Sequence, residues 1–477
     1  MVSHKRVAIV GGGITGLTVC YRLQRAIQQD HLPLEVILLE SSDRLGGIIH
    51  THHDHNLLVE HGPDSFITNK PWAVELCDEL EMSEAYVGTT TAHRQSFIVR
   101  HGALRPVPKG LYLMVPGSLW PFATSSVMSW RGKLRMGLDL VLPRRTSTED
   151  ESLAHFVRRR FGREALERVA QPMVGGIYTA NPEHLSLQAT MPQFLEMERR
   201  HGSLIRAMQH RQRVASSQEA SGPRYGLFLS FRDGMQTLVE RLRSCIPDCR
   251  VRLRTEVSSV AFQPGSSHWR LHMRHAPALD VDAVCLALPA PQASRLLCSA
   301  DPELATDLQI PYASSAILNL AFKRSDIDHP LNGMGFVVPA IEKRTLLACS
   351  FSSVKFDGRA PMDQVLLRAF VGGALHQSEL DRSDAAIQQS VCQDLQQLLG
   401  ITGDPIYAHL QRWPQSMAQY HLGHIQRVTR IEDRVRRLSG LALAGNAYHG
   451  VGIPDCIHSG NLAAQALLDH LSPTAVP

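Results

Sequence analysis

The stretch "RVAIVGGGITGLTVCYRLQ" constrains the fold of the chain more than any other. The apolar run Val7 to Val10 predicts a buried strand, and a helical pattern follows the glycines. Gly11 permits a tight turn, Gly13 lets the backbone approach a phosphate, and Gly16 lets the helix pack against the strand. A second strand, "LEVILLE", ends on Glu40, at the distance expected for a carboxylate that binds ribose hydroxyls. The pattern predicts a Rossmann-like βαβ unit that binds a dinucleotide.

The next stretch, "ESSDRLGGII", indicates which dinucleotide binds. It carries Arg44 and the doublet Gly46-Gly47, and it resembles the ExxxRxGG signature of the amine oxidase-like flavoproteins. The resemblance implies non-covalent FAD, with the arginine and the glycines against its pyrophosphate. The residues expected around this part of FAD are Gly11, Gly12, Gly13, Ile14, Thr15, Gly16, Glu40, Ser41, Arg44, Gly46, Gly47 and Ile48.

Four histidines and an aspartate crowd the stretch "HTHHDHN", and histidine is the commonest metal ligand. In the amine oxidase-like family a hairpin follows the Gly-Gly doublet, and "IIHTHHDHNLLVEHGPDSF" fits this order, with Asp54 and Asn56 as turn residues. We therefore expect solvated histidines on an exposed hairpin and no functional metal, since no second-shell carboxylate is evident. The residues that the resemblance places beside the flavin after this hairpin are Gly62, Pro63, Asp64 and Ser65.

The C-terminal stretch "GLALAGNAYHGVGIPDCIHSGNLAAQALLDHL" reads as a strand, a glycine-rich turn and a helix. Pro454 suits a helix start, and Asp455 is favourable in the first turn. A helix N-terminus here would stabilise the negative charge that builds at N1 and C2=O of reduced flavin. The stretch also resembles the C-terminal FAD segment of the same family. The further FAD neighbours implied by resemblance are Val257, near the adenine, Trp413, Asn446, Val451, Gly452 and Ile453.

Within this superfamily, the stretches "QPMVGGIYTANPEHLSL", "DAVCLALPAPQASRLL" and "SSVKFDGRAP" resemble the protoporphyrinogen oxidases. The resemblance runs from about residue 5 to 470 and departs at Thr179-Ala180, where Ala-Gly is usual. It implies the six-electron oxidation of protoporphyrinogen IX, with oxygen as acceptor and hydrogen peroxide as product. Three alternatives remain open: coproporphyrinogen III as substrate, an amine oxidase or carotenoid desaturase-like activity, and a non-catalytic carrier of flavin or haem.

The porphyrinogen site is expected to be apolar, with one or two cations for the carboxylate arms. By resemblance, the stretch "NGMGFVVP" places Met334 and Val337 beside the ring, and Gly176 presents its backbone near the flavin. Arg94 is the candidate partner of a carboxylate arm. Ordinary core packing of Met334 and Val337, and a plain surface position of Arg94, are the alternatives.

A length of 477 residues predicts more than one domain, and the motifs predict an α/β fold. The expected parts are a discontinuous FAD-binding domain at 1–90, 206–290 and 413–477, a helical region at 91–205, and a mixed-sheet substrate domain at 291–412. Between Arg94 and Arg145, cations alternate with apolar pieces and Asp139 is the lone acid, which suits a membrane surface. By resemblance this insertion associates with a membrane; a solvated basic face is the alternative.

Composition narrows the partners and the compartment. A net charge of +4 gives no reason to expect nucleic acid. Nine scattered cysteines without a CxxC pair predict neither a zinc site nor a disulfide framework, and they fit the cytoplasm. Without an apolar run of about 18 residues, membrane contact is expected to be peripheral, on the inner face of the cell membrane. A homodimer and hand-off to a ferrochelatase are further candidate associations.

Overall fold

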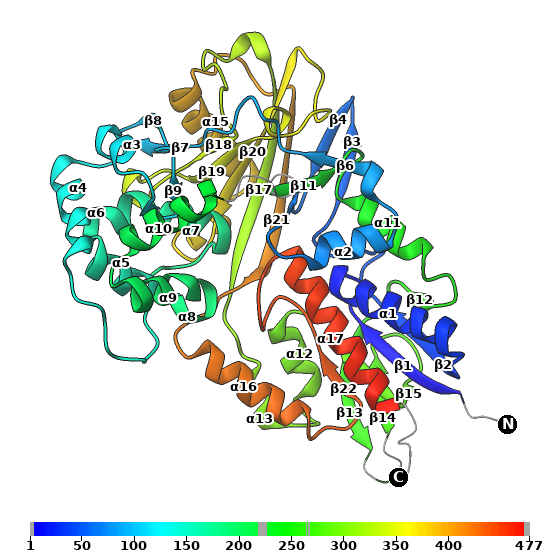
Figure 1. Ribbon diagram of the computed structural model, residues 1–477. Coiled ribbons are helices and arrows are strands. Elements are labelled where there is room, and N and C mark those ends of the chain that lie inside the picture. The colour runs from blue at the N-terminus through cyan, green and yellow to red at the C-terminus, as the bar shows by residue number, and fades with distance from the viewer. Residues whose placement is uncertain (1–3, 218–226, 264, 266–267, 472–477) are drawn as a thin grey trace.

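A five-stranded sheet contains the N-terminal βαβ unit in this computed structural model, which describes residues 4–217, 227–263, 265 and 268–471 (Figure 1). Its strands lie in the order β12 (Arg250–Arg252), β2 (Leu34–Leu39), β1 (Lys5–Val10), β16 (Ala283–Leu286) and β22 (Leu441–Leu443). Every neighbouring pair is parallel. The sheet therefore joins the start, the middle and the end of the chain in one layer. Residues 1–3, 218–226, 264, 266–267 and 472–477, which belong to the predicted FAD-binding domain, lie outside the described residues.

Successive side chains of β1 enter two different cores, because the sheet is covered on both faces. Val7 and Ile9 pack on one face, and Ala8 and Val10 pack on the other. The helices of the first core are α1 (Ile14–Asp30), α2 (Trp72–Glu79), α11 (Gln236–Ser244) and α17 (Ile453–Leu471). The second core holds β13 (Val257–Gln263), β14 (His268–Met273), β15 (Leu279–Val281), α12 (Ala290–Leu297), α13 (Pro302–Asp307) and α16 (His424–Val435). Burial on both faces explains the uninterrupted apolar run in the sequence.

Glycines allow the first and last helices to approach the sheet and each other. A Cβ on Gly16 would lie 1.9 Å from the carbonyl oxygen of Gly11, so only glycine lets α1 start this close to β1. A Cβ on Gly460 would lie 2.9 Å from the carbonyl oxygen of Thr15. As a result, α17 lies along α1 (Figure 1).

A seven-stranded mixed sheet forms the second large layer. Its strands lie in the order β21 (Tyr407–Ala418), β17 (Tyr312–Lys323), β20 (Gln364–Gly372), β19 (Leu346–Phe351), β18 (Gly335–Val337), β7 (Phe97–Arg100) and β8 (Ala103–Pro106). The helix α15 (Asp384–Leu399) packs on it through Ile387, Val391 and Leu395. β7 pairs with β18, so the predicted helical region begins with strands of this sheet, and the predicted boundary at 412 falls inside β21. The division into domains otherwise stays a prediction.

Helices cluster between residues 119 and 217 around a separate apolar core (Figure 1). They are α3 (Leu119–Thr124), α4 (Trp130–Gly137), η2 (Leu138–Leu140), α5 (Leu153–Arg160), α6 (Arg163–Ala165), the π-helical turn η3 (Leu166–Ala170), α7 (Gln171–Tyr178), α8 (Leu187–Thr190), α9 (Pro192–His201) and α10 (Leu204–Ser217). The short elements elsewhere are β3 (Thr51–Asp54), β4 (Leu57–Glu60), β5 (Phe66–Ile67), η1 (Ser83–Ala85), β6 (Tyr86–Gly88), β9 (Leu111–Tyr112), β10 (Val115–Pro116), β11 (Phe228–Phe231), η4 (Arg324–Asp326), η5 (Ala340–Glu342), α14 (Ser352–Lys355) and η6 (Gln377–Asp381).

Asp139, the lone acid of the basic stretch, is fully buried in this helical cluster. Its carboxylate accepts hydrogen bonds from Arg160 Nε at 2.6 Å, from Ser203 Oγ at 2.5 Å and from the backbone N–H of Ile205 at 3.0 Å. Arg160 is also fully buried. Buried ions need partners of this kind, so the pair fixes η2 against α5 and α10.

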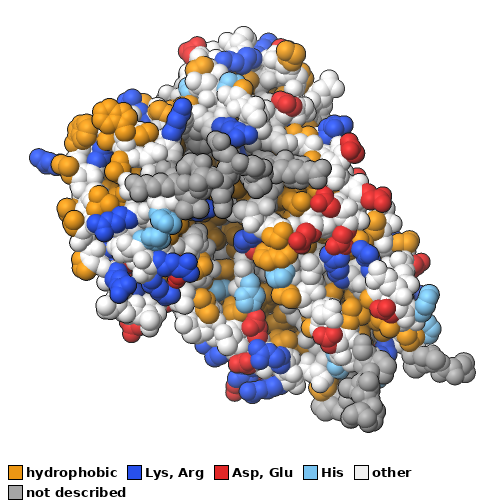
Figure 2. All heavy atoms as spheres, viewed as in Figure 1, with side chains coloured by type: hydrophobic (Ala, Val, Ile, Leu, Met, Phe, Trp, Pro, Cys, Tyr) orange, Lys and Arg blue, Asp and Glu red, His pale blue; other side chains and the backbone are white. Residues whose placement is uncertain are grey.

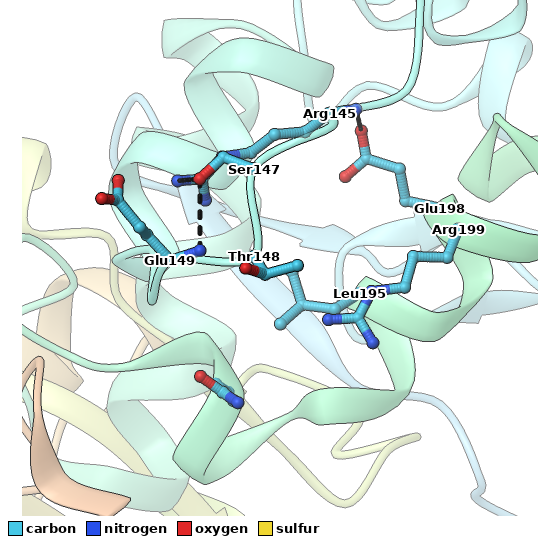
Figure 3. A pocket seen from close by; sticks show the side chains of 8 residues that line it. Arg145, Ser147, Thr148, Glu149, Leu195, Glu198 and Arg199 are labelled. Atoms are coloured by element: carbon cyan, nitrogen blue, oxygen red, sulfur yellow. Dashed lines mark hydrogen bonds between the residues drawn. The ribbon is translucent and has the colours of Figure 1, made fainter. Parts of the chain in front are cut away.

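A small hollow beside this ion pair is drawn in Figure 3. Its lining side chains are Arg145, Ser147, Thr148, Glu149, Gln188, Leu195, Glu198 and Arg199. The backbone N–H of Arg145 donates to Glu198 Oε1 at 3.0 Å, and the backbone N–H of Glu149 donates to Ser147 Oγ at 3.2 Å (Figure 3). Because these groups bond to one another and include none of the predicted site residues, we assign the hollow a structural role.

Candidate functional site

The N-terminus of α1 faces open space at its glycines. Gly13 precedes α1 without a capping side chain, and a Cβ placed on it would meet no atom within 4 Å. Gly13 also bridges to Gly46, and a Cβ on Gly47 would lie 3.3 Å from the Cα of Gly13. Gly13, Gly46 and Gly47 thus form a phosphate cradle at the start of α1. Free backbone N–H groups at a helix N-terminus bind phosphate, so this cradle fits the pyrophosphate of a dinucleotide.

Glu40 holds the glycine turn from the end of β2. Its carboxylate accepts hydrogen bonds from the backbone N–H groups of Gly12 at 2.6 Å and Ser42 at 2.8 Å. The backbone N–H of Thr255 donates to the carbonyl oxygen of Glu40 at 2.8 Å. Val257, the first residue of β13, therefore comes to the same end of the sheet as Glu40, where the ribose and the adenine are predicted.

Arg44 orders the turn that contains the second glycine pair. Its guanidinium donates to the backbone carbonyls of Leu45 at 3.2 Å, Ile49 at 3.0 Å and Gly47 at 2.6 Å. Burial lowers the pKa of Arg44 from its ordinary value. These three hydrogen bonds use much of the donor capacity of the guanidinium. The main role of Arg44 is therefore to hold the turn that carries Gly46 and Gly47. Its direct contact with the pyrophosphate stays a prediction.

A buried ionic cluster fixes the predicted flavin neighbours Gly62 to Ser65. Lys355 Nζ lies 3.1 Å from both carboxylate oxygens of Asp64, and Arg368 Nη1 lies 2.9 Å from one of them. Burial alone would raise the pKa of Asp64, but the two cations outweigh it and hold that pKa well below its ordinary value. Arg368 also donates to the carbonyl of Gly62. The sequence pattern did not reveal Lys355 and Arg368, because both are far from Asp64 along the chain.

The expected histidine hairpin is present, but one of its histidines is not solvated as predicted. β3 pairs with β4, and His55 and Asn56 form the turn with positive φ. His50 turns inward, and its Nδ1 lies 3.1 Å from Nδ1 of the buried His61, which stacks on His409 with ring centroids 4.2 Å apart. The His50 ring meets the buried His61 ring edge-on at an interplanar angle of 83°, so His50 is only partly exposed. Within the described ranges, no group of three or more candidate ligands has the geometry of a metal site.

We expect His61 to make the fold less stable in acid. Burial, followed by repulsion from His409 and His50, lowers the pKa of His61 from 6.5 to about 3. Below about pH 6.5 the unfolded chain therefore binds a proton at His61, whereas the folded chain does not. The free energy of unfolding falls as the pH drops from about 6.5 to about 3, by up to about 1.4 kcal/mol per pH unit. Glu60, whose pKa burial raises from 4.5 to about 7, acts with the opposite sign between those values.

Thermal unfolding between about pH 4 and 7 checks this expectation. A His61→Gln variant should lose less stability than the wild type as the pH falls, because glutamine does not titrate and the opposite effect of Glu60 remains. The exposed His53 is the matched control, and His53→Gln should leave the slope unchanged. Identical slopes in all three proteins would show that His61 does not control acid stability.

The C-terminal turn is fixed by tyrosines rather than left free for a ligand. Asn446 Oδ1 accepts from Tyr312 OH at 2.9 Å, Asn446 Nδ2 donates to the carbonyl of Ser416 at 3.1 Å, and the Asn446 carbonyl accepts from Tyr420 OH at 2.8 Å. The side chain of Asn446 thus positions the turn between β22 and α17. Trp413 Nε1 donates to the carbonyl of His61 at 2.7 Å and ties β21 to the Gly62 segment.

The N-termini of α1 and α17 lie together. The side chain of Thr15 hydrogen-bonds to Cys456, and burial raises the pKa of that thiol to about 12. Cys456 packs against the first core as a partly buried residue. Val451 and Gly452 lie in the turn before α17, and Ile453 is its first residue. Two helix N-termini therefore converge where the sequence predicts FAD, one at the pyrophosphate and one at the flavin ring.

The predicted substrate residues come from three elements. Gly176 lies in α7, and a Cβ on it would be 3.8 Å from Val337 Cγ1 of β18. Val337 and Val451 both stay partly exposed while packing against the core of the helical cluster. Met334 donates its backbone N–H to the carbonyl of Gln95 at 2.8 Å, and the neighbouring Arg94 is exposed. The structure therefore brings Gly176 and Val337 together, while Met334 precedes β18 and is bonded to Gln95, next to Arg94.

A Gly13→Ala variant is expected to fold normally but to bind flavin weakly. The φ of Gly13 is −72°, which alanine adopts without strain, and its Cβ would meet no protein atom. That Cβ would instead enter the space predicted for the pyrophosphate. We expect an unchanged melting temperature of the flavin-free protein and at least about a tenfold loss in flavin affinity, measured by fluorescence titration. Unchanged affinity would place the nucleotide elsewhere.

A parallel sheet with a glycine cradle at one helix N-terminus and a second helix N-terminus beside it defines a dinucleotide-dependent oxidoreductase. Residues 14–468 match the family model described as flavin containing amine oxidoreductase. The chain belongs to this family, and it is a flavin-containing oxidoreductase.

No helix of the described residues is both long and apolar enough to cross a membrane.

Named relatives extend over almost the whole chain. Coproporphyrinogen III oxidase of Bacillus subtilis (strain 168) is 34% identical over 468 residues, which are 98% of each chain. Protoporphyrinogen oxidase 2, chloroplastic/mitochondrial, of Arabidopsis thaliana is 27% identical and covers 98% of this chain and 95% of its own. A crystal structure from Exiguobacterium sp. 255-15, provisionally named protoporphyrinogen oxidase, superposes with a TM-score of 0.87 at 32% identity, over 99% of this chain and 100% of that one.

Proposed function

We propose that this flavoenzyme oxidises a porphyrinogen to its porphyrin, with oxygen as the final acceptor and hydrogen peroxide as the second product. The observation that carries the proposal is the end-to-end similarity to the Bacillus subtilis relative, at 34% identity and with 98% of both chains covered. The bound flavin supplies a two-electron acceptor. The apolar residues Gly176, Met334 and Val337 orient the macrocycle, and no side chain is assigned as acid or base.

Between the two candidate substrates we favour coproporphyrinogen III. The relative with that name is 34% identical to this chain, whereas the plant protoporphyrinogen oxidase is 27% identical. The exposed Arg94 also suits a substrate with four carboxylate arms. Protoporphyrinogen IX, which the sequence motifs suggested first, is the second candidate.

Parallel assays of the two porphyrinogens test both parts of the proposal. Purified holoenzyme is incubated in air with each substrate, and porphyrin fluorescence is followed together with the flavin absorbance. Faster turnover of coproporphyrinogen III supports our preference, and faster turnover of protoporphyrinogen IX reverses it. If the flavin is present and neither substrate reacts, the porphyrinogen proposal fails, and amines and carotenoids are the next substrates to assay.

We also propose that the helical cluster docks on an anionic membrane surface. Between residues 119 and 141 its large exposed apolar side chains are Leu119, Trp120, Trp130, Leu134, Leu138 and Val141. Figure 2 shows hydrophobic side chains gathered at the end of the molecule that carries α3 and α4. Lys133 Nζ lies 4.4 Å from the ring centroid of Trp130, which is 67% exposed. Tryptophan rings flanked by cations suit the interface between lipid headgroups and acyl chains.

Replacing Trp120, Trp130 and Leu134 together by serine is expected to weaken binding to anionic vesicles at least about tenfold, because three large apolar side chains no longer enter the interface. Vesicle co-sedimentation measures the binding, and flavin content shows that the fold is intact. Met362→Ser is the control, since Met362 is exposed but lies outside this cluster. Equal binding of the triple variant and the wild type would favour the solvated basic face.

A further inference from the structure

Lys70 and Asp455 form an ion pair at the N-terminus of α17. Lys70 Nζ lies 2.6 Å from Asp455 Oδ1, although the two residues stand near opposite ends of the chain. Asp455 is 8% exposed. Its other oxygen accepts the backbone N–H of Gly452 at 3.2 Å, and a Cβ on Gly450 would lie 2.2 Å from its Cγ. The carboxylate therefore lies directly against the backbone of the turn that leads into α17.

The loop that carries Lys70 is held in place against α17. Lys70 lies between β5 and α2, and Trp72 at the start of α2 stacks on His458 of α17 with ring centroids 3.9 Å apart and an interplanar angle of 8°. This stack fixes the loop relative to the first turns of α17. The ion pair and the ring stack together hold the Lys70 loop and α2 against α17.

Asp455 also acts on the helix that carries the predicted substrate residue Gly176. Burial, and after it the negative charge of Asp455, raises the pKa of Tyr178, in α7, to about 12. The carboxylate is therefore within electrostatic reach of both α7 and the start of α17.

Helix capping explains Asp455 but does not explain Lys70. A carboxylate in the first turn is already stabilised by the helix dipole and by the Gly452 N–H. A flavin ring at the same N-terminus also gains negative charge when it is reduced, and an unneutralised Asp455 would oppose that charge. A nearby cation removes this opposition.

We propose that Lys70 is a positioning residue for the oxidoreductase reaction: it neutralises Asp455 and thereby makes the flavin bound at α17 easier to reduce. The inference rests on the proposed function, with the flavin ring at its predicted position beside the start of α17. It does not depend on which substrate is oxidised. It assigns roles to two residues that the sequence motifs did not connect.

A double-mutant cycle on the holoenzyme tests the proposal without any porphyrinogen. The variants are Lys70→Met, Asp455→Asn and the double variant, and the midpoint potential of the bound flavin is measured by absorbance against reference dyes. Lys70→Met should lower the ratio of reduced to oxidised flavin at a fixed potential about tenfold, as expected for one uncompensated charge several Å away. Asp455→Asn should raise the ratio, and the double variant should return close to the wild type.

The control is Lys323→Met, an exposed lysine at the end of β17, which should leave the potential unchanged. Potentials that are equal in Lys70→Met and the wild type, or that shift in the same direction in both single variants, would overturn the proposal. If Lys70→Met does not retain flavin, Asp455→Asn alone decides, since an unchanged or lower potential there contradicts it. If the midpoint potentials shift as expected but the holoenzyme does not turn over porphyrinogens, only the proposed substrate is rejected.

Discussion

A Gly16→Ala variant is expected to lose its bound flavin and at least about 3 kcal/mol of stability. The new Cβ would lie 1.9 Å from the carbonyl oxygen of Gly11. That oxygen cannot move away freely, because the backbone N–H of Gly11 is bonded to Leu39 of the neighbouring strand at 2.8 Å. The start of α1 must therefore shift, and the phosphate cradle shifts with it.

Flavin content after gel filtration and the thermal unfolding curve measure the two effects of Gly16→Ala. Gly137→Ala is the matched control, because Gly137 ends α4 with φ −60° and a Cβ there meets no atom within 4 Å. The control should be as stable as the wild type or slightly more stable. Full flavin content and a normal melting temperature in Gly16→Ala would show that the α1–β1 contact is not essential.

Asp139→Ala is expected to destabilise the protein by about 3 kcal/mol, because it removes the nearer counter-ion of the fully buried Arg160 and leaves Glu198, whose Oε1 lies 3.5 Å from Arg160 Nη1. The helical cluster should loosen first, since Asp139 joins η2 to α5 and α10. Replacing both partners, Asp139→Leu with Arg160→Met, should recover most of the loss. Chemical denaturation followed by fluorescence measures the free energy of unfolding.

The control for Asp139 is Asp433, whose carboxylate pairs with Arg436 on the surface of α16. Exposed pairs contribute little, so Asp433→Ala should change stability by less than about 1 kcal/mol. If Asp139→Ala and Asp433→Ala were equally stable, the buried pair would not hold the helical cluster together. If the Asp139→Leu, Arg160→Met variant were no more stable than Asp139→Ala, the loss would come from packing rather than from the unpaired ion.

Local chemistry was enough to predict the elements around the cofactor. The strand, turn and helix at Val7 to Gly16 follow from contacts within a few residues, and the structure places β1, α1 and β2 there. The helix at Pro454 was predicted for the same reason, and the hairpin of the histidine stretch was expected from the family resemblance; both are present. The family resemblance, carried by longer motifs, is confirmed by the match over residues 14–468.

The sequence by itself determined the βαβ unit and the flavin family, because each depends on steric or hydrophobic patterns that neighbouring residues set. Only the tertiary structure decided which charges form pairs: Asp64 with Lys355 and Arg368, Lys70 with Asp455, and Asp139 with Arg160. It also turned His50 inward onto His61. An ion pair depends on distance in space, and a charged residue in the sequence carries no record of the distant partner that burial will bring to it.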